Sequence, residues 1–300
     1  MPHFADLVYQ FGGAPVGAGM PLGGKSKFFF IDIATNGASD GNDGLSPDHA
    51  VLSFYMALAK CVSGRRDTIY VLNYASANET EWPISVNKAG VSIFGARGGG
   101  YMPRYTGGQI IQPTSDAAGM TLDANNIRVD GLEFRAGASY SGIMFDTAGV
   151  SRHGIYNCVF TSGAYGVWAT ANSMPSQGPH IKNCTFLANL TSDGILYVSN
   201  GAFARFEDNI FDECGGIAIN ITGAAHAGFV LNNVISMKAA TAAKGIVITG
   251  SEAQRWIIDG NHANFGATTM TNNPYWDSSG QDNHWLLNYR DIVAVLPAES

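Results

Sequence analysis

A six-residue segment occurs six times in this chain, and it constrains the fold more than any other feature. The copies read VDGLEF, IYNCVF, IKNCTF, FEDNIF, VLNNVI and IDGNHA, and they begin at residues 129, 155, 181, 206, 230 and 258. Successive copies are 24 to 28 residues apart. A period of this length is typical of a solenoid, in which each repeat is one structural unit that stacks on the next.

The third residue of every copy is Gly, Asn or Asp. These residue types tolerate a left-handed backbone, so the position is predicted to be a one-residue turn between two short strands. The residue after it is Cys158, Cys184, Asn209, Asn233 or Asn261 in five copies, and asparagines stacked there can form an amide ladder. The six turn positions are Gly131, Asn157, Asn183, Asp208, Asn232 and Gly260.

A second short strand recurs between the copies. It reads GIMFD, GVWAT, GILYV, GIAIN and GIVIT, each beginning with Gly before Ile or Val. Strands of four to six residues that return once per repeat, without helical patterns long enough for a crossover, are the sequence form of a parallel β-helix. We therefore expect an all-β, single-stranded parallel β-helix of about nine turns over residues 28–265.

Composition agrees with such a stack and excludes several function classes. Only 14% of residues are charged, whereas 37 of 300 are glycine, as tight corners and an apolar interior require. The net charge of −7 argues against a nucleic-acid partner. No apolar run is long enough for a membrane span, and the N-terminus lacks the pattern of a signal peptide. Four cysteines are too few for a disulfide scaffold, and we expect reduced thiols, with Cys158 and Cys184 stacked and buried.

The N-terminal part of the chain resembles the entry segment of pectate-lyase-like right-handed β-helix proteins. The resemblance rests on FFFIDIATNGASDGNDGLSPDHAVLSFYMALAKC (28–61), RRDTIYVLN (65–73) and GVSIFGARGGG (90–100). It implies a right-handed β-helix, with a strand and a loop leading into a capping helix. We place that helix at 46–62, with Ser46 as N-cap and Pro47 at its first position. The loop Asp40–Gly44 matches a calcium loop only in part, so we interpret it as a solvated turn.

The two ends of the chain differ from the repeats. Residues 1–27 form an apolar, glycine-rich arm that we expect to dock on a partner or a sister chain, with folding back along its own helix as the alternative. Its candidate partner-binding residues are Phe4, Leu7, Val8, Tyr9, Phe11 and Val16. Residues 266–300 are expected to cap the core or pack subunits together, and stacking on sugars is the alternative. The aromatic residues there are Tyr275, Trp276, Trp285 and Tyr289.

A β-helix can host polysaccharide lyases and hydrolases, but catalysis requires particular residues and does not follow from the fold. The pectate lyase motifs WiDH and RxPxxR are absent, as are the polygalacturonase motifs NTD, DD, GHG and RIK. A glycosidase would still need two carboxylates, one with a raised pKa. The candidates are Glu207 with Asp212 and Glu213, or Asp146 with Asp193. Outward, solvated side chains are the simpler interpretation of the first set.

The sequence leaves two functions open. The chain resembles the short β-helix trimers that bacteriophages use as tailspike-like fibres or capsid decoration (cement) proteins. That resemblance implies a homotrimer on the virion surface, made in the host cytoplasm and attached to the major capsid protein or another virion protein through residues 1–27. A host surface glycan is a further candidate partner. The alternative is a tailspike-type or free polysaccharide depolymerase. We expect no cofactor, no metal and no membrane insertion in either case.

Overall fold

The computed structural model describes residues 25–35, 37–96, 109–170, 177–237, 244–264 and 274–290, together with short strands at 293–294 and 298–299. The arm residues expected to bind a partner, Phe4 to Val16, lie outside these ranges. Within them, no helix is both long and apolar enough to cross a membrane.

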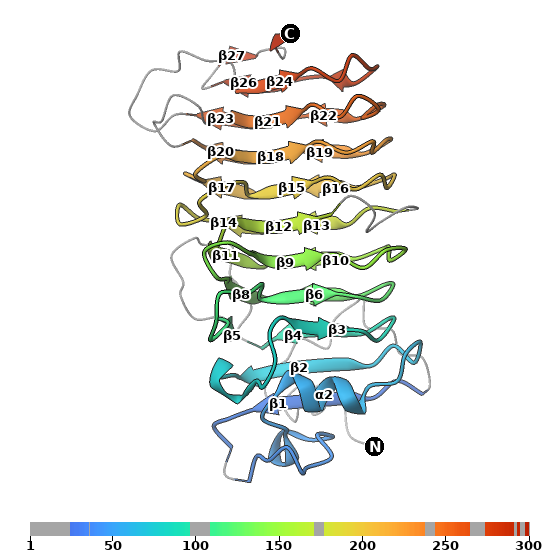
Figure 1. The fold of residues 1–300 in the computed structure, drawn as a ribbon, viewed down its shortest axis with the longest axis vertical. Coiled ribbons are helices and arrows are strands. Elements are labelled where there is room, and N and C mark those ends of the chain that lie inside the picture. The colour runs from blue at the N-terminus through green and yellow to red at the C-terminus, as the bar shows by residue number, and fades with distance from the viewer. Residues whose placement is uncertain are drawn as a thin grey trace, which may run out of the picture.

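The described chain winds into three long parallel sheets (Figure 1). Sheet A has ten strands: β1 (Phe28–Asp32), β2 (Thr68–Asn73), β4 (Ser92–Gly95), β7 (Arg128–Asp130), β10 (Gly154–Tyr156), β13 (His180–Lys182), β16 (Arg205–Glu207), β19 (Phe229–Leu231), β22 (Ile257–Asp259) and β25 (His284–Trp285). Sheet B has nine: β3 (Ile84–Val86), β6 (Met120–Leu122), β9 (Ser141–Phe145), β12 (Tyr165–Ala169), β15 (Ile195–Tyr197), β18 (Ile217–Ile221), β21 (Lys244–Ile248), β24 (Tyr275–Asp277) and β28 (Ala298–Glu299). Sheet C also has nine: β5 (Gln109–Ile111), β8 (Leu132–Arg135), β11 (Val159–Ser162), β14 (Thr185–Phe186), β17 (Ile210–Asp212), β20 (Val234–Ser236), β23 (His262–Asn264), β26 (Tyr289–Arg290) and the antiparallel β27 (Val293–Ala294).

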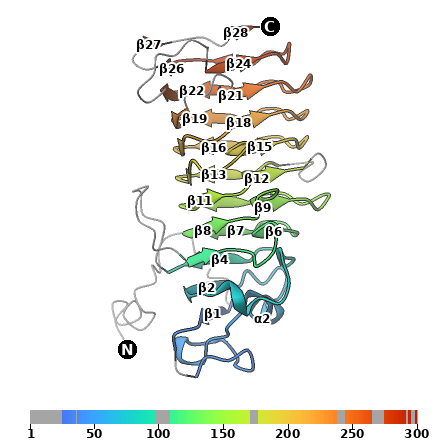
Figure 2. The same ribbon diagram turned by 60° about the vertical axis from the view of Figure 1, so that its left-hand side comes forward.

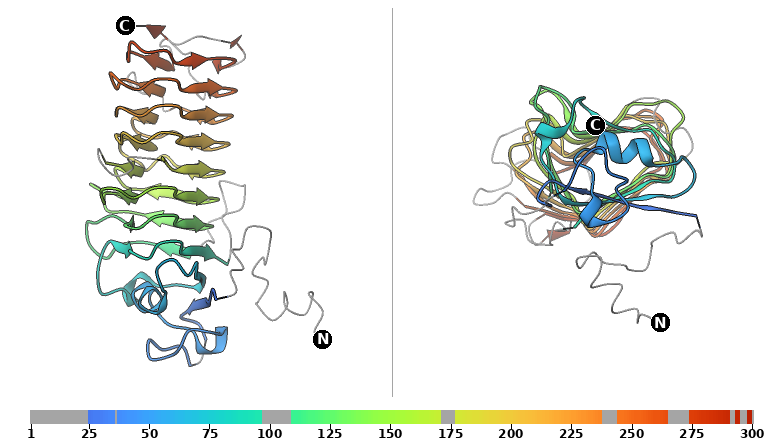
Figure 3. Two further views of the ribbon diagram at one scale, coloured as in Figure 1. Left: turned by 90° about the vertical axis from the view of Figure 1, so that its right-hand side faces the viewer. Right: turned by 90° about the horizontal axis from the view of Figure 1, so that it is seen from below.

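Each turn of the chain visits the sheets in the order A, C, B, and successive turns lie directly on one another (Figure 2). The strands from β4 to β24 make seven complete turns, β1 to β3 lead into them, and β25, β26 and β28 pass through the three sheets once more. The expected parallel β-helix is confirmed, although about nine turns is a slightly higher count than the complete turns. Viewed along the stack, the turns enclose one interior (Figure 3).

The six turn positions have the backbone that their residue types predict. Their φ angles run from 51° at Asn157 to 71° at Gly131, all in the left-handed region. Each residue lies between a sheet A strand and a sheet C strand. The apolar residues two positions earlier pair in register from turn to turn, for example Val129 with Ile155 and Ile155 with Ile181. Because the turn is one residue long in each repeat, the flanking strands of every copy direct the same positions toward the interior.

Two side-chain ladders run up that interior. Phe134, Phe160, Phe186 and Phe211 stack with ring centroids 5.3, 4.8 and 4.6 Å apart. Beside the turns, the Nδ2 of Asn209 donates to Oδ1 of Asn233 at 3.0 Å, and the same bond recurs at 2.8 Å from Asn233 to Asn261 and from Asn261 to Asn288. The amide ladder thus forms and is one residue longer than the repeat alignment indicated.

Cys158 and Cys184 continue the amide ladder toward the N-terminus as thiols. All four are free and buried. The backbone N–H of Cys184 donates to Oδ1 of Asn209. This N–H is therefore paired at the point where the ladder changes from asparagine to cysteine side chains. Burial raises the pKa of the Cys158 thiol, and neighbouring Cys184 adds to this effect. The Cys158 thiol is therefore held in its neutral, unreactive form.

The capping helix is shorter than predicted. A 3-10 turn, η1 (Pro47–His49), follows Ser46, but the α-helix α2 covers only Phe54–Lys60, and its N-cap is Ser53, whose side chain accepts from the amide of Met56. A second 3-10 turn, η2, covers Ser76–Asn78. The prediction of one helix over 46–62 was wrong because Val51 forms an isolated bridge to Ile31, which holds the intervening backbone extended. The buried face of α2 still joins the core at the N-terminal end.

The C-terminal aromatic residues divide between the interior and the surface. Tyr275 is fully buried, and its hydroxyl donates to the carbonyls of Asn261 and Tyr289 at 3.0 and 2.8 Å. Trp285 packs against the same core and donates to Asp277. Trp276 instead points outward beneath Lys244, and Tyr289 is 37% exposed. Tyr275 and Trp285 thus lie where a cap of the core was expected, whereas the other two are surface groups.

Candidate functional site

The outer surface of sheet A concentrates aromatic and charged side chains and is the first candidate site. Strands of a sheet point alternate side chains to opposite faces, so the residues flanking the buried central position of each strand face outward. We call this surface face A. Its members between β7 and β19 are Arg128, Asp130, Tyr156, His180, Lys182, Arg205, Glu207 and Phe229.

Cations and rings alternate along face A. The guanidinium of Arg128 lies over the rings of Phe94 and Tyr156, at 5.1 and 4.7 Å, and donates to Asp130 at 2.6 Å. The Tyr156 hydroxyl is 3.3 Å from Nδ1 of His180. Every contact joins neighbouring strands or residues of the same strand. These side chains therefore tie one turn to the next.

Glu207, the main catalytic candidate, lies at the centre of face A. Its carboxylate accepts from Nε of Arg205 at 2.6 Å, lies 3.1 Å from Nε2 of His180, and is 3.8 Å from Nζ of Lys182. Lys182 also pairs with Asp208 at 3.0 Å. Burial alone would raise the pKa of Glu207, but the hydrogen bonds from Arg205 and His180 outweigh it and hold that pKa below its usual value. The side chain is therefore an ionised acceptor at neutral pH and a poor proton donor.

The structure does not bring the other candidates into one site. Asp212 ends β17 in sheet C and is exposed, and Glu213 is an exposed turn residue with φ 55°. Neither forms a described contact with Glu207. Asp146 follows β9 and Asp193 precedes β15, so they lie at opposite ends of sheet B strands that are two apart.

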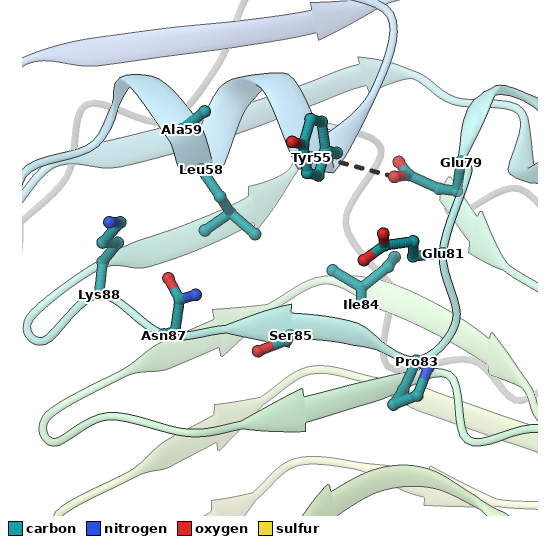
Figure 4. Close-up of a pocket in the computed structure, with 10 residues that line it drawn as sticks. All are labelled: Tyr55, Leu58, Ala59, Glu79, Glu81, Pro83, Ile84, Ser85, Asn87 and Lys88. Carbon is teal, nitrogen blue, oxygen red and sulfur yellow. Dashed lines mark hydrogen bonds between the residues drawn. The ribbon is translucent and has the colours of Figure 1, made fainter.

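A second candidate site is a cavity of about 260 Å³ between α2 and β3 (Figure 4). Glu79 and Glu81 lie on one side of it, and Asn87 and Lys88 on the other. Glu79 accepts from the amides of Phe54 at 2.6 Å and Tyr55 at 3.3 Å. It is 8% exposed, and burial raises its pKa despite those bonds. Glu81 is exposed.

This cavity contains what the search for catalytic residues required, namely two carboxylates of which one has a raised pKa. Sequence reasoning missed it because its walls come from a helix and a strand about 25 residues apart. The only local signal was the spacing of two glutamates in Asn78-Glu79-Thr80-Glu81, which by itself indicates nothing more than an acidic loop.

The loop Asp40–Gly44 anchors the capping segment. Oδ1 of Asp40 accepts from the amides of Leu52 and Ser53, at 2.8 and 3.2 Å, and its carboxylate also accepts from the Ser53 hydroxyl. The part of the chain that the structure describes contains no group of three or more His, Cys, Asp or Glu side chains placed to hold a metal ion.

Comparison with known proteins follows from this geometry. A family model described as "Right handed beta helix region" matches residues 114–263, which is half of the chain. The chain belongs to the right-handed β-helix family. The matched region runs from just before β6 to β23, so it covers the stack that carries the six turn positions and the amide ladder up to Asn261. No curated protein matches this β-helix chain.

Two solved structures are similar to this β-helix protein. One is a GH136 lacto-N-biosidase from Eubacterium ramulus, with 12% sequence identity and a TM-score of 0.55 over 88% of this chain and 56% of that one. The other is a rhamnogalacturonan lyase, with 13% identity and a TM-score of 0.41 over 88% and 87% of the two chains. At these identities the likeness concerns the fold alone. The chain spans little more than half the length of the biosidase.

Proposed function

We propose that this β-helix protein is a structural component of a bacteriophage virion, most specifically a trimeric capsid decoration protein attached to the shell by its N-terminal arm. The observation that carries the proposal is the chemistry of face A. Its carboxylates form ion pairs with neighbouring cations. These pairs stabilise the stack, and they do not favour a protonated carboxyl group that could transfer a proton.

The argument starts from Glu207. A general acid must hold its proton near neutral pH, which requires a raised pKa. Arg205 and His180 lower the pKa of Glu207 instead, and Lys182 lies 3.8 Å from its carboxylate. Asp130 is likewise paired with Arg128. A rod whose surface charges stiffen it is suited to packing and attachment.

Attachment is assigned to residues 1–27, on the sequence evidence of their apolar and glycine-rich composition. The partner would be the major capsid protein or another virion protein, bound through the side chains from Phe4 to Val16, and the location would be the virion surface. An arm of this kind gains its order when it binds, so removing it would abolish attachment without unfolding the β-helix.

Copurification with assembled particles tests this proposal. The full chain is expected to sediment with phage particles, and a variant lacking residues 1–25 is expected to stay in the supernatant with an unchanged β-sheet circular dichroism spectrum. Wild-type binding by the truncated protein would overturn the arm model. Failure of the full chain to sediment with any particle fraction of its own phage would overturn the virion assignment.

A second function, polysaccharide depolymerase, is favoured by one observation, the Glu79 and Glu81 pair in the cavity beside α2. Glu79 would act as the acid, because burial raises its pKa, and exposed Glu81 as the base or nucleophile. Release of reducing or unsaturated sugar ends from a host capsule or lipopolysaccharide is then expected, and Glu81→Gln should abolish it. Glu207→Gln is the matched control and should leave it intact. No release by the wild-type protein would exclude this function.

A further inference from the structure

One outward row of sheet B differs from the rest of the surface. From β9 to β24 the second-last residue of each strand in this sheet faces outward, and in β9, β12 and β18 the residues on either side of it are buried. The pairing places one such residue per turn in exact register along six consecutive strands. We call this row face B, and its members are Met144, Trp168, Leu196, Asn220, Val247 and Trp276.

Face B contains no ionisable side chain over these six turns. Five of its members are partly exposed, and Val247 is buried. The same turns carry charges on both other sheets. Face A has His180, Lys182, Arg205 and Glu207, and sheet C has Asp212. Face B is therefore a strip of five apolar residues and Asn220, with the exposed Asp146 as a charge just past its β9 end.

The nearest charges are already satisfied within the chain. Nζ of Lys244 lies 4.2 Å from the ring centroid of Trp276. The Asp193 carboxylate is buried and accepts from Nδ2 of Asn220 and from the amide of Ile217, both at 2.9 Å. Neither group interrupts the row.

Symmetry explains why such a strip suits contact with copies of the same chain. When identical rods stand parallel around a rotation axis, the row facing the axis meets its own copies, so each residue lies at the same height as its equivalents. A charged residue in that row would face a like charge at every height, which is destabilising. Only an uncharged row avoids this, and face B is the longest such row in the described turns, because the outward row of sheet C is uncharged only from Val159 to Val234.

We infer that face B is the contact surface of a parallel homotrimer, with its row directed at a three-fold axis that runs along the rod. The occupant is a second and third copy of this chain. This inference rests on the proposed function for the number of copies. It adds which of the three sides is buried and in what orientation.

Cysteine cross-linking tests the orientation. The native cysteines are buried, so single variants Met144→Cys and Leu196→Cys each add one accessible thiol on face B. In a parallel trimer both variants are expected to link two chains through a short bismaleimide, because each thiol meets its own copy. Val234→Cys, at a 44% exposed site on sheet C, is the matched control and should give no link. Linking at one height alone would indicate an antiparallel pair and would overturn the inference.

Charge insertion tests the surface itself. The molar mass of the wild-type protein in solution is expected to be three times the 31.7 kDa of one chain, and Leu196→Glu should reduce it to one chain. Val234→Glu should remain trimeric. A monomeric wild type would overturn the trimer of the proposed function. A trimer that survives Leu196→Glu but dissociates in Val234→Glu would overturn face B alone. Circular dichroism identifies a variant that fails to fold, and the cross-linking result then decides.

Discussion

Two carboxylates with almost the same exposure behave in opposite ways on two sides of this molecule. Glu207 on face A is 6% exposed, and Asp193 beside face B is 8% exposed. Burial raises the pKa of Asp193, and bonds from Asn220 and Ile217 offset only part of that effect. Burial also acts on Glu207, but Arg205 and His180 reverse it and its pKa is lowered.

The difference lies in the partners. Asp193 has an amide and a backbone N–H, which are neutral donors, whereas Glu207 has the cations Arg205 and Lys182 and the imidazole of His180 within 3.8 Å. Asp193 also lies deeper among protein atoms. Low exposure alone therefore does not tell whether a carboxylate keeps its proton. The depth of the carboxylate and the supply of cations together do, and the cations are on face A.

The largest expected effect that tests this contrast is at neutral pH. Glu207→Gln should lower the free energy of unfolding by about 2 kcal/mol, because it leaves Arg205 and His180 without their anion. Asp193→Asn should cost less than about 1 kcal/mol, because an amide oxygen still accepts from Ile217 and no cation loses its partner. Urea unfolding at pH 7 measures both. Equal losses in the two variants would contradict the contrast.

The pH dependence should be intermediate in size and opposite in sign for the two sites. Because the pKa of Glu207 is lowered on folding, its stabilising effect is complete above the pKa of an unfolded glutamate, about 4.3, and disappears as the pH falls through the folded value. Wild type and Glu207→Gln should therefore converge in stability on acidification. The raised pKa of Asp193 has the reverse effect, since wild type should gain stability relative to Asp193→Asn as the pH falls through the folded value.

Urea midpoints measured from pH 7 down to pH 3 for the three proteins check this prediction. A gap between wild type and Glu207→Gln that widens on acidification would reverse the assignment of Glu207 as an ionised partner.

The smallest effect concerns Asp208, which is partly exposed and pairs with Lys182. Asp208→Asn should change stability by less than about 0.5 kcal/mol, because exposed ion pairs contribute little. Asn occupies the same turn position in three other repeats, so the backbone is undisturbed. Asp208→Ala should cost about 1 to 2 kcal/mol, because its φ of 54° suits alanine poorly. Thermal unfolding in low and high salt separates the two contributions, and equal shifts in both variants would assign the effect to charge.

The stack was predictable from the sequence because its determinants are local. A left-handed turn selects Gly, Asn or Asp whatever surrounds it, and a ladder selects like residues at like positions, so Asn157 and Asn233 could be placed without a structure. Handedness came from the resemblance to known β-helix proteins and not from the repeat itself.

The candidate sites were much less predictable. Glu207 was found as an acidic residue, but two of its partners, His180 and Lys182, lie on the neighbouring strand β13. The third, Arg205, reaches it because the pleat puts alternate residues of β16 on one face. The Glu79 and Glu81 cavity needs α2 to lie across the first turn. The start of α2 also depends on the bridge between Val51 and Ile31. The helix signals near Ser46 give no indication of that bridge.

The one-residue turn at each copy has a consequence for how such a protein can change in evolution. Removing or adding one residue between a sheet A strand and the following sheet C strand would put the ladder positions of that turn out of register, whereas the loops absorb the difference between repeats of 24 and 28 residues and leave both ladders intact. The molecule can therefore lengthen or shorten only in complete turns, and each turn moves its far end by about 4.8 Å. The length of the stack therefore changes in steps of one turn.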